Sequence, residues 1–258
     1  DVTKLGNELM PAGYCSPKGR LLATPRLFQE GDTIGMIVAA SNADYLVKRL
    51  KMYVLRSKVT IERAADREVA GFVGSAPTNL GDGALVFELP CALPQARIAA
   101  ALPSGLGLTI VPKGTACAGS EPLWWAACAA AGQSWVFGET AERFTPHAVN
   151  LDLIGGISFN KGCYTGQEVV SRIEHIGKTN RRTVLLAAND PLELAPGTDL
   201  TDNQGQVVAT VLYGAKLADR TLLLAEVSTE TAQSEVALDT TAATLHRLPL
   251  PYGWTRTK

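Results

Sequence analysis

Apolar and polar residues recur along the first two thirds of the chain with both strand and helix periods. Alternating or continuous apolar runs between turn residues predict strands over 21–29, 33–39, 59–62, 69–73, 84–89 and 106–111. Helical spacing predicts one helix from Ser41, as its N-cap, to about residue 54, and another from Ser120 to Gly132. A short helix over 95–102 is also predicted. Strands and helices in this order indicate an α+β fold.

The last third of the chain consists of short apolar runs that turn signals interrupt. These runs predict strands over 183–188, 207–213, 222–227 and 236–238. The segment Asp202-Asn203-Gln204-Gly205 predicts a hairpin turn between two of them. Just before this region, residues 169–172 also have a strand-like pattern. Short strands in series predict a small antiparallel barrel or sandwich.

The composition is that of an ordered globular protein. Of the 258 residues, 46% are hydrophobic and 19% are charged, which argues against disorder. The formal net charge of −1 creates no overall field for nucleic acid or an anionic membrane, and no apolar run is long enough to span a bilayer. We expect neither direct nucleic-acid binding nor membrane attachment. Because the chain begins with Asp1, we expect further residues upstream.

The cysteines are odd in number and widely spaced, at Cys15, Cys91, Cys117, Cys128 and Cys163. No Cys-x-x-Cys pair occurs, and the three histidines are equally scattered, so the pattern favours neither a disulfide framework nor a zinc site. We expect no metal site built by the chain alone. Free cysteines are typical of a reducing compartment, and we expect a cytoplasmic protein.

One stretch, residues 155–168, combines features of a reactive loop. Gly162 and Gly166 bracket Cys163 and Tyr164 and permit backbone conformations with positive φ. Lys161 is near enough in sequence to favour the thiolate form of Cys163 if the two side chains converge. The alternative is a structural turn that contains a buried, inert cysteine.

The motif Lys161-Gly162-Cys163-Tyr164-Thr165-Gly166-Gln167-Glu168 resembles the signature of the YgfZ family of folate-binding proteins. That family is a branch of the glycine-cleavage aminomethyltransferase superfamily. The flanks are also similar, at Pro146, 150–151, 155–159 and 180–182. The resemblance implies an aminomethyltransferase-like fold: two α+β segments around a central channel within residues 1–180, and an antiparallel β-barrel over 181–258.

The resemblance implies tetrahydrofolate or a related folate as ligand. It assigns folate binding to Trp124, although this side chain equally suits the core, and to Lys161 and Tyr164 beside the cysteine. Lys18 and Arg20, in the turn after Ser16-Pro17, would meet the anionic tail of a folate. The residues alone favour two solvated cations on a hairpin.

Two departures from the family pattern bear on activity. Relatives usually have a glutamate before the Ala-Gly that ends the second helix, and this chain has Ala130 there. Aminomethyltransferases carry a catalytic aspartate near the Lys18 turn, where this chain has no acidic residue. A carboxylate for the pterin ring and one for catalysis are therefore absent from the expected positions.

The function that the resemblance implies is a folate-binding accessory protein. It would support iron–sulfur cluster assembly or repair in client enzymes, including tRNA-modifying ones, with Cys163 as reactive thiol. Gly162, Gly166, Gln167 and Glu168 would support the loop, and Arg172 would hold Glu168. One alternative is a tetrahydrofolate-dependent one-carbon transferase. Another is a scaffold with a vestigial pocket, in which loss of Cys163 would have no effect.

Overall fold

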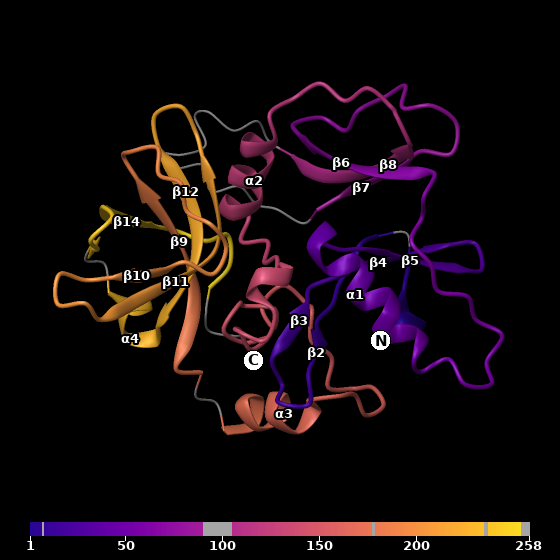
Figure 1. The fold of residues 1–258 in the computed structure, drawn as a ribbon, viewed down its shortest axis with the longest axis horizontal. Helices are drawn as coiled ribbons and strands as arrows, with labels where there is room; N and C mark the ends of the chain where they lie inside the picture. Colours follow the sequence, from indigo (N-terminus) through magenta and orange to yellow (C-terminus); the bar gives the residue numbers. More distant parts are fainter. Residues whose placement is uncertain (7, 90–104, 177–178, 235–236, 254–258) are drawn as a thin grey trace.

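The computed structural model describes residues 1–6, 8–89, 105–176, 179–234 and 237–253. The fold is mixed α/β, with smaller sheets on one side of helix α2 (Glu121–Ala130) and a large antiparallel sheet on the other (Figure 1). The helix predicted over 95–102 lies outside the described residues. No helix among the described residues is long and apolar enough to cross a membrane.

The first sheet is built from residues near the N-terminus. Its strands β1 (Met10–Pro11), β4 (Arg26–Glu30) and β5 (Thr33–Ile37) pair in the order β1-β4-β5. Strands β2 (Tyr14–Cys15) and β3 (Leu21–Ala23) form a separate hairpin. A short 3₁₀ helix, Val2–Lys4, precedes them. The run predicted as one strand over 21–29 is therefore two strands in different sheets, divided at Thr24-Pro25.

The first predicted helix is confirmed as α1 (Ala40–Lys51), but its expected N-cap is wrong. Ala39 occupies the N-cap position, and the Ser41 hydroxyl instead accepts a hydrogen bond from the Gly138 N–H at 2.9 Å. The strand predicted over 59–62 is also wrong. Those residues pair with no described strand, and three of the four are exposed.

The second sheet has the order β6-β8-β7 and all its pairs are antiparallel. Its strands are β6 (Arg67–Val73), β7 (Leu85–Glu88) and β8 (Leu106–Pro112), as predicted. Helix α2 packs against it, and the Trp124 indole N–H donates to the Gly107 carbonyl at 3.0 Å. A Cβ on Gly71 would lie 2.2 Å from the same indole nitrogen, so this contact requires glycine.

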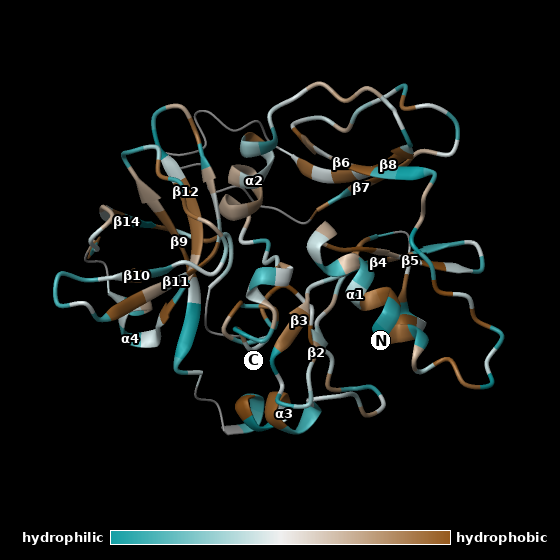
Figure 2. Cartoon of the chain, in the orientation of Figure 1, coloured by the Kyte–Doolittle hydropathy of each residue, from teal (hydrophilic) through white to brown (hydrophobic). Residues whose placement is uncertain are grey.

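The third sheet has six antiparallel strands that curl into a half-barrel. They are β9 (Arg181–Ala188), β10 (Asp199–Thr201), β11 (Val207–Lys216), β12 (Thr221–Ser228), β13 (Leu238–Asp239) and β14 (Thr244–Leu248), in the order β10-β11-β12-β9-β14-β13. The predicted turn at 202–205 joins β10 to β11, and its tip is hydrophilic (Figure 2). Helix α4 (Thr229–Gln233) follows β12.

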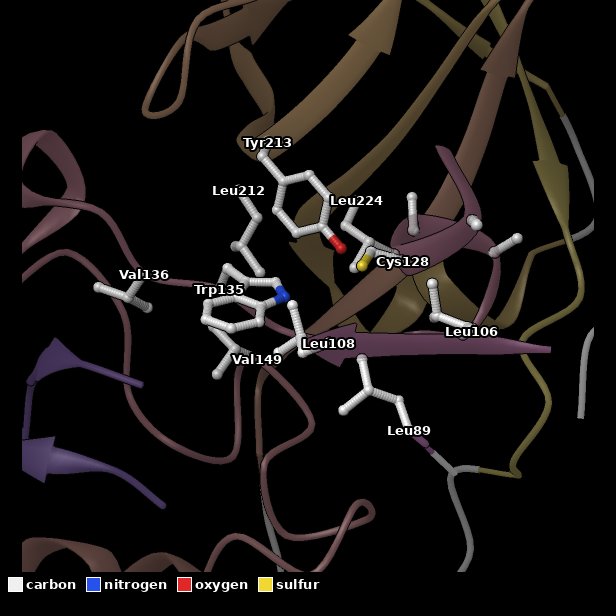
Figure 3. Close-up of a cluster of buried hydrophobic side chains, with 14 of the residues drawn as sticks. Leu89, Leu106, Leu108, Cys128, Trp135, Val136, Val149, Leu212, Tyr213 and Leu224 are labelled. Carbon is white, nitrogen blue, oxygen red and sulfur yellow. The ribbon is translucent and has the colours of Figure 1, made fainter. Parts of the chain in front are cut away.

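The main core joins the half-barrel to the smaller sheets. Figure 3 shows Cys128 of α2 beside Tyr213 of β11 and Leu108 of β8, with the Trp135 ring close by. The Tyr213 hydroxyl donates to the Gln133 carbonyl at 2.6 Å. Because α2 is rich in buried alanines, it approaches both sheets closely.

A strand predicted over 169–172 is wrong, because these residues belong to helix α3 (Gln167–Ile176). Val170 is fully buried, whereas Arg172 is exposed, and Figure 2 shows both hydrophobic and hydrophilic residues along this helix. The helix starts directly after Gly166, whose φ is +82°. A short 3₁₀ helix, Gly138–Thr140, lies earlier in the chain.

Candidate functional site

Two predicted motifs that are far apart in sequence meet at the start of α3. Gly19, at the tip of the β2–β3 hairpin, has φ +67°, and Gly166 has φ +82°. A Cβ on Gly166 would lie 2.5 Å from the Ser16 carbonyl oxygen, and one on Gly19 would lie 2.7 Å from the Val169 Cβ. The loop that carries Cys163 therefore rests on the hairpin that carries Lys18 and Arg20.

Cys163 is a free, exposed cysteine on this loop. The alternative of a buried, inert cysteine is therefore wrong for this residue. The Lys161 ammonium lies 5.2 Å from the centroid of the Tyr164 ring, a cation–π contact. The loop thus presents a thiol, a cation and an aromatic ring within four consecutive residues.

Tyr164 carries a polar group that solvent does not reach. Its hydroxyl is buried and has no hydrogen-bond partner among the described residues. Burial raises the pKa of Tyr164, and the nearby Cys15 thiol adds to the effect. Burial also raises the pKa of Cys15 to about 12, so this second thiol is protonated at neutral pH.

The residues predicted to support the loop act in different ways. The Tyr164 N–H donates to the Gln167 side-chain oxygen at 3.3 Å, so Gln167 reaches back to the loop. Arg172 pairs with Glu168 at 2.6 Å across one turn of α3, as predicted, but both side chains are largely exposed. Gly162 has open space around it, whereas Gly166 is in close contact with the hairpin.

The two cations of the hairpin differ in their contacts. Lys18 is exposed at the tip. The Arg20 guanidinium donates to the Arg143 carbonyl at 2.6 Å, so this side chain helps to hold the hairpin against a neighbouring segment. Neither the exposure of Lys18 nor the hydrogen bond of Arg20 identifies a ligand.

Trp124 lies away from the Cys163 loop, because α2 is in the upper middle of the molecule in Figure 1 and α3 is at its lower edge. It belongs to an aromatic cluster with Trp125, at 4.7 Å between ring centroids, and Trp135, at 6.1 Å. Trp125 also contacts Tyr213 at 5.2 Å. Sequence reasoning placed Trp124 and Cys163 around one channel, and the structure separates them.

A cavity of about 230 Å³ lies where the N-terminal sheet, the end of α2 and the C-terminal segment meet. Its wall is formed by Leu9, Pro11, Arg26, Leu89, Ala131, Gln133, Leu153, Ile154, Pro251 and Tyr252. Of the predicted ligand-binding residues, none belongs to this wall.

Sequence reasoning missed the polar residues of the cavity. Arg26 is 1% exposed, and its guanidinium lies 4.4 Å from the centroid of the Trp135 ring. The Tyr252 hydroxyl donates to the Gly132 carbonyl at 2.9 Å. A single arginine within the apolar strand run 25–28 was the available signal, since a cation in a core-facing strand needs a structural or functional partner.

Two further features bear on the chemistry. Burial lowers the pKa of Arg26 to about 10, so the guanidinium remains charged at neutral pH. Within the described ranges, no cluster of three or more His, Cys, Asp or Glu side chains has the arrangement of a metal site. The chemical groups at hand are thus a buried cation in a cavity and an exposed thiol on a separate loop.

Comparisons with known proteins agree with the sequence motif. No family model matches the chain. Similar curated proteins include the tRNA-modifying protein YgfZ of Cronobacter sakazakii, 31% identical over 98% of this chain and 84% of the relative. The tRNA-modifying protein YgfZ of Yersinia pestis is 31% identical over 93% of this chain and 80% of its own length.

A solved structure has the same fold. The glycine cleavage system aminomethyltransferase T from Bartonella henselae superimposes with a TM-score of 0.68 over 97% of this chain and 78% of its own. Its sequence is 12% identical, so this likeness concerns the fold alone.

Proposed function

We propose a function for this chain from the family to which it belongs, the YgfZ family. Its membership follows from relatives named tRNA-modifying protein YgfZ, which are 31% identical to it along almost its whole length. It acts as a folate-binding accessory protein that supports iron–sulfur cluster assembly or repair in client enzymes, including enzymes that modify tRNA. Its partners are a folate and these clients or their assembly proteins, and its location is the cytoplasm.

The observation that carries folate binding is the cavity at the end of α2, in a chain with an aminomethyltransferase-like fold. Its volume of about 230 Å³ suits one ring system and is below the range for a drug-sized ligand, about 300–1,000 Å³. The pterin ring enters the cavity and the rest of the folate extends outward. Apolar side chains line most of the wall, as a flat heterocycle requires.

Cys163 acts separately from the cavity. It is exposed on a loop that two close-packed glycines hold against the hairpin, so a partner protein has access to the thiol. A thiol in this position attacks a disulfide of a client, which releases one client sulfur as a thiolate and leaves a mixed disulfide, or it ligates a cluster in transit. Lys161 and Tyr164 form the adjacent surface.

A one-carbon transferase is less well supported. Such an enzyme needs a general acid or base beside the folate. Among the described residues that line the cavity, none is Asp or Glu. If the protein turned over methylene-tetrahydrofolate, the one-carbon transferase would replace the accessory role as its function.

The ligand part of the proposal is tested by calorimetric titration of tetrahydrofolate into wild type and Ala131→Leu. Ala131 is 1% exposed and lines the cavity, so three added carbons reduce its volume. We expect saturable binding by wild type and a loss of affinity of tenfold or more in the variant. Ala65→Leu, at an exposed position, is the matched control and keeps wild-type affinity. Wild type that binds no reduced folate would refute the proposal.

The client part is tested in cells that lack this protein, by the level of tRNA modifications that iron–sulfur enzymes install. Wild type and Cys117→Ala restore these modifications, whereas Cys163→Ala does not. Cys117 is the matched control because it is also free and exposed. If Cys163→Ala fully restored the tRNA modifications, the thiol would have no role and the protein would be a scaffold.

A further inference from the structure

Arg26 is a buried charge that neutral groups hold within the described part of the chain. Its guanidinium donates to the carbonyls of Thr24, at 3.2 Å, and Ser134, at 3.0 Å, and to the Gln133 side-chain oxygen at 3.2 Å. All three acceptors are neutral. No carboxylate of the described residues forms an ion pair with it, although a buried charge is costly to keep unpaired.

The side chain has N–H groups without a partner among the described residues. A guanidinium has five N–H groups, and three of those on Arg26 are used. Its Nε is buried without a partner among the described residues, and the side chain lines the cavity. The remaining wall is mostly apolar, formed by Leu9, Pro11, Leu89, Leu153, Ile154 and Pro251. The cavity is therefore bordered by a cation with unpaired N–H groups, and most of the rest of its wall is apolar.

No carboxylate belongs to the wall that the described residues form. The last residues of α2 and its cap, Ala130 and Ala131, carry no carboxylate, and Ala131 lines the cavity. A pterin ring has two different polar edges. Its 2-amino group and N3–H donate hydrogen bonds and suit a carboxylate, whereas its 4-oxo group accepts them and suits a guanidinium.

We infer that the pterin ring is held by its acceptor edge, with the 4-oxo group accepting a hydrogen bond from Arg26. The inference rests on the proposed function, because it takes a folate as the ligand. It makes Arg26 a specificity-determining residue: the cavity selects 4-oxo pterins and rejects 4-amino pterins. In a 4-amino pterin, a donor replaces the acceptor and faces the buried cation.

The test compares folic acid with aminopterin, which differs from it by an amino group in place of the 4-oxo group. Calorimetric titration of wild type should give at least about tenfold tighter binding of folic acid, the value of one hydrogen bond to a charged group. Equal or tighter binding of aminopterin would overturn the inference and leave the proposed function intact. Binding of neither ligand nor tetrahydrofolate would overturn both.

Substitutions of Arg26 identify the group responsible. Arg26→Met keeps the length of the side chain but removes its donors, so folic acid should bind about tenfold more weakly and the preference over aminopterin should disappear. Arg26→Lys keeps the charge and should keep a preference. Arg220→Met, in an exposed pair with Asp219, is the control with wild-type behaviour. Should Arg26→Met fail to fold, the two-ligand comparison on wild type decides the question alone.

Discussion

At the scale of single residues, one ion pair joins the segment before the Cys163 loop to the half-barrel. Arg182 of β9 donates to both carboxylate oxygens of Asp152, at 2.8 and 3.1 Å, and to the His147 carbonyl at 2.8 Å. The two side chains are only 12% and 3% exposed. A bidentate pair in this position is specific in its geometry, and removal of one partner leaves a buried charge.

We predict that Asp152→Ala lowers the free energy of unfolding by about 3 kcal/mol, because Arg182 then remains buried without its carboxylate. Equilibrium unfolding in urea measures the change. Asp219→Ala is the matched control, since the Asp219–Arg220 pair is exposed, and it should change stability by less than about 1 kcal/mol. Equal effects of the two substitutions would show that the buried pair has no special weight.

The sequence is a poor guide to which single residues line a ligand site. Trp124 was a candidate ligand-binding residue, yet its indole N–H is bonded to Gly107 and its ring fits over Gly71. Arg26 lay in an apolar run and was not selected, although it lines the cavity. The chemistry of either side chain is visible in the sequence, but its partners come from other elements.

At the scale of elements, the contact between the β2–β3 hairpin and the start of α3 positions the Cys163 loop. Both glycines at this contact have positive φ, and each lacks room for a side chain. Helix α3 is further attached by a hydrogen bond of 3.1 Å between His147 and Glu174. The loop therefore has a defined support on the hairpin side and the helix side.

Gly166→Ala and Gly162→Ala should differ sharply. Alanine at Gly166 adopts an unfavourable φ of +82° and places its Cβ 2.5 Å from the Ser16 oxygen, so we expect a loss of at least about 1 kcal/mol in unfolding free energy. Alanine at Gly162 meets no atom within 4 Å and should cost less than about 0.5 kcal/mol. Urea unfolding of both variants measures this, and similar losses would contradict the proposed support.

Helix α3, in which residues 169–172 were predicted as a strand, shows how a local pattern fails. Residues 169–172 contain two adjacent valines, which favour a strand locally. In α3 one of them, Val170, is buried against the rest of the chain, while Arg172 pairs along the helix with Glu168. Tertiary burial of one helical face outweighed the local preference of β-branched residues.

At the scale of the whole molecule, the C-terminal segment returns to the N-terminal half. Tyr252 follows the last strand of the half-barrel, yet its hydroxyl bonds to Gly132 after α2 and its side chain lines the cavity. Gly132 has φ +64°, and a Cβ there would lie 2.4 Å from the Tyr252 oxygen. The predicted boundary at residue 180 stays a prediction, since this contact and the main core both cross it.

We predict that Tyr252→Ala lowers the free energy of unfolding by about 2 kcal/mol, because it removes packing and a hydrogen bond at this junction. It should also weaken tetrahydrofolate binding by opening the cavity. Thermal unfolding and calorimetric titration measure the two effects. Tyr45→Ala, at a side chain 47% exposed, is the control and should alter neither. Unchanged stability in Tyr252→Ala would mean that the C-terminal segment does not close the cavity.

The sequence by itself determined the elements and the family. Apolar periodicity predicted most strands of the three sheets and both longer helices of the first half, because period and turn chemistry are local properties. The motif around Cys163 identified the family, since eight consecutive residues carry that information. The Arg172–Glu168 pair also follows from spacing in the sequence, whereas the structure was needed to show that Cys163 is exposed.

Only the tertiary structure decided which of these residues share a site. Arg26, Ala131 and Tyr252 are more than 100 positions apart from one another, and packing brings them to one cavity. The same packing separates Trp124 from Cys163 and brings Gly19 against Gly166. Such contacts depend on the burial of apolar surface between distant segments, which no local pattern encodes.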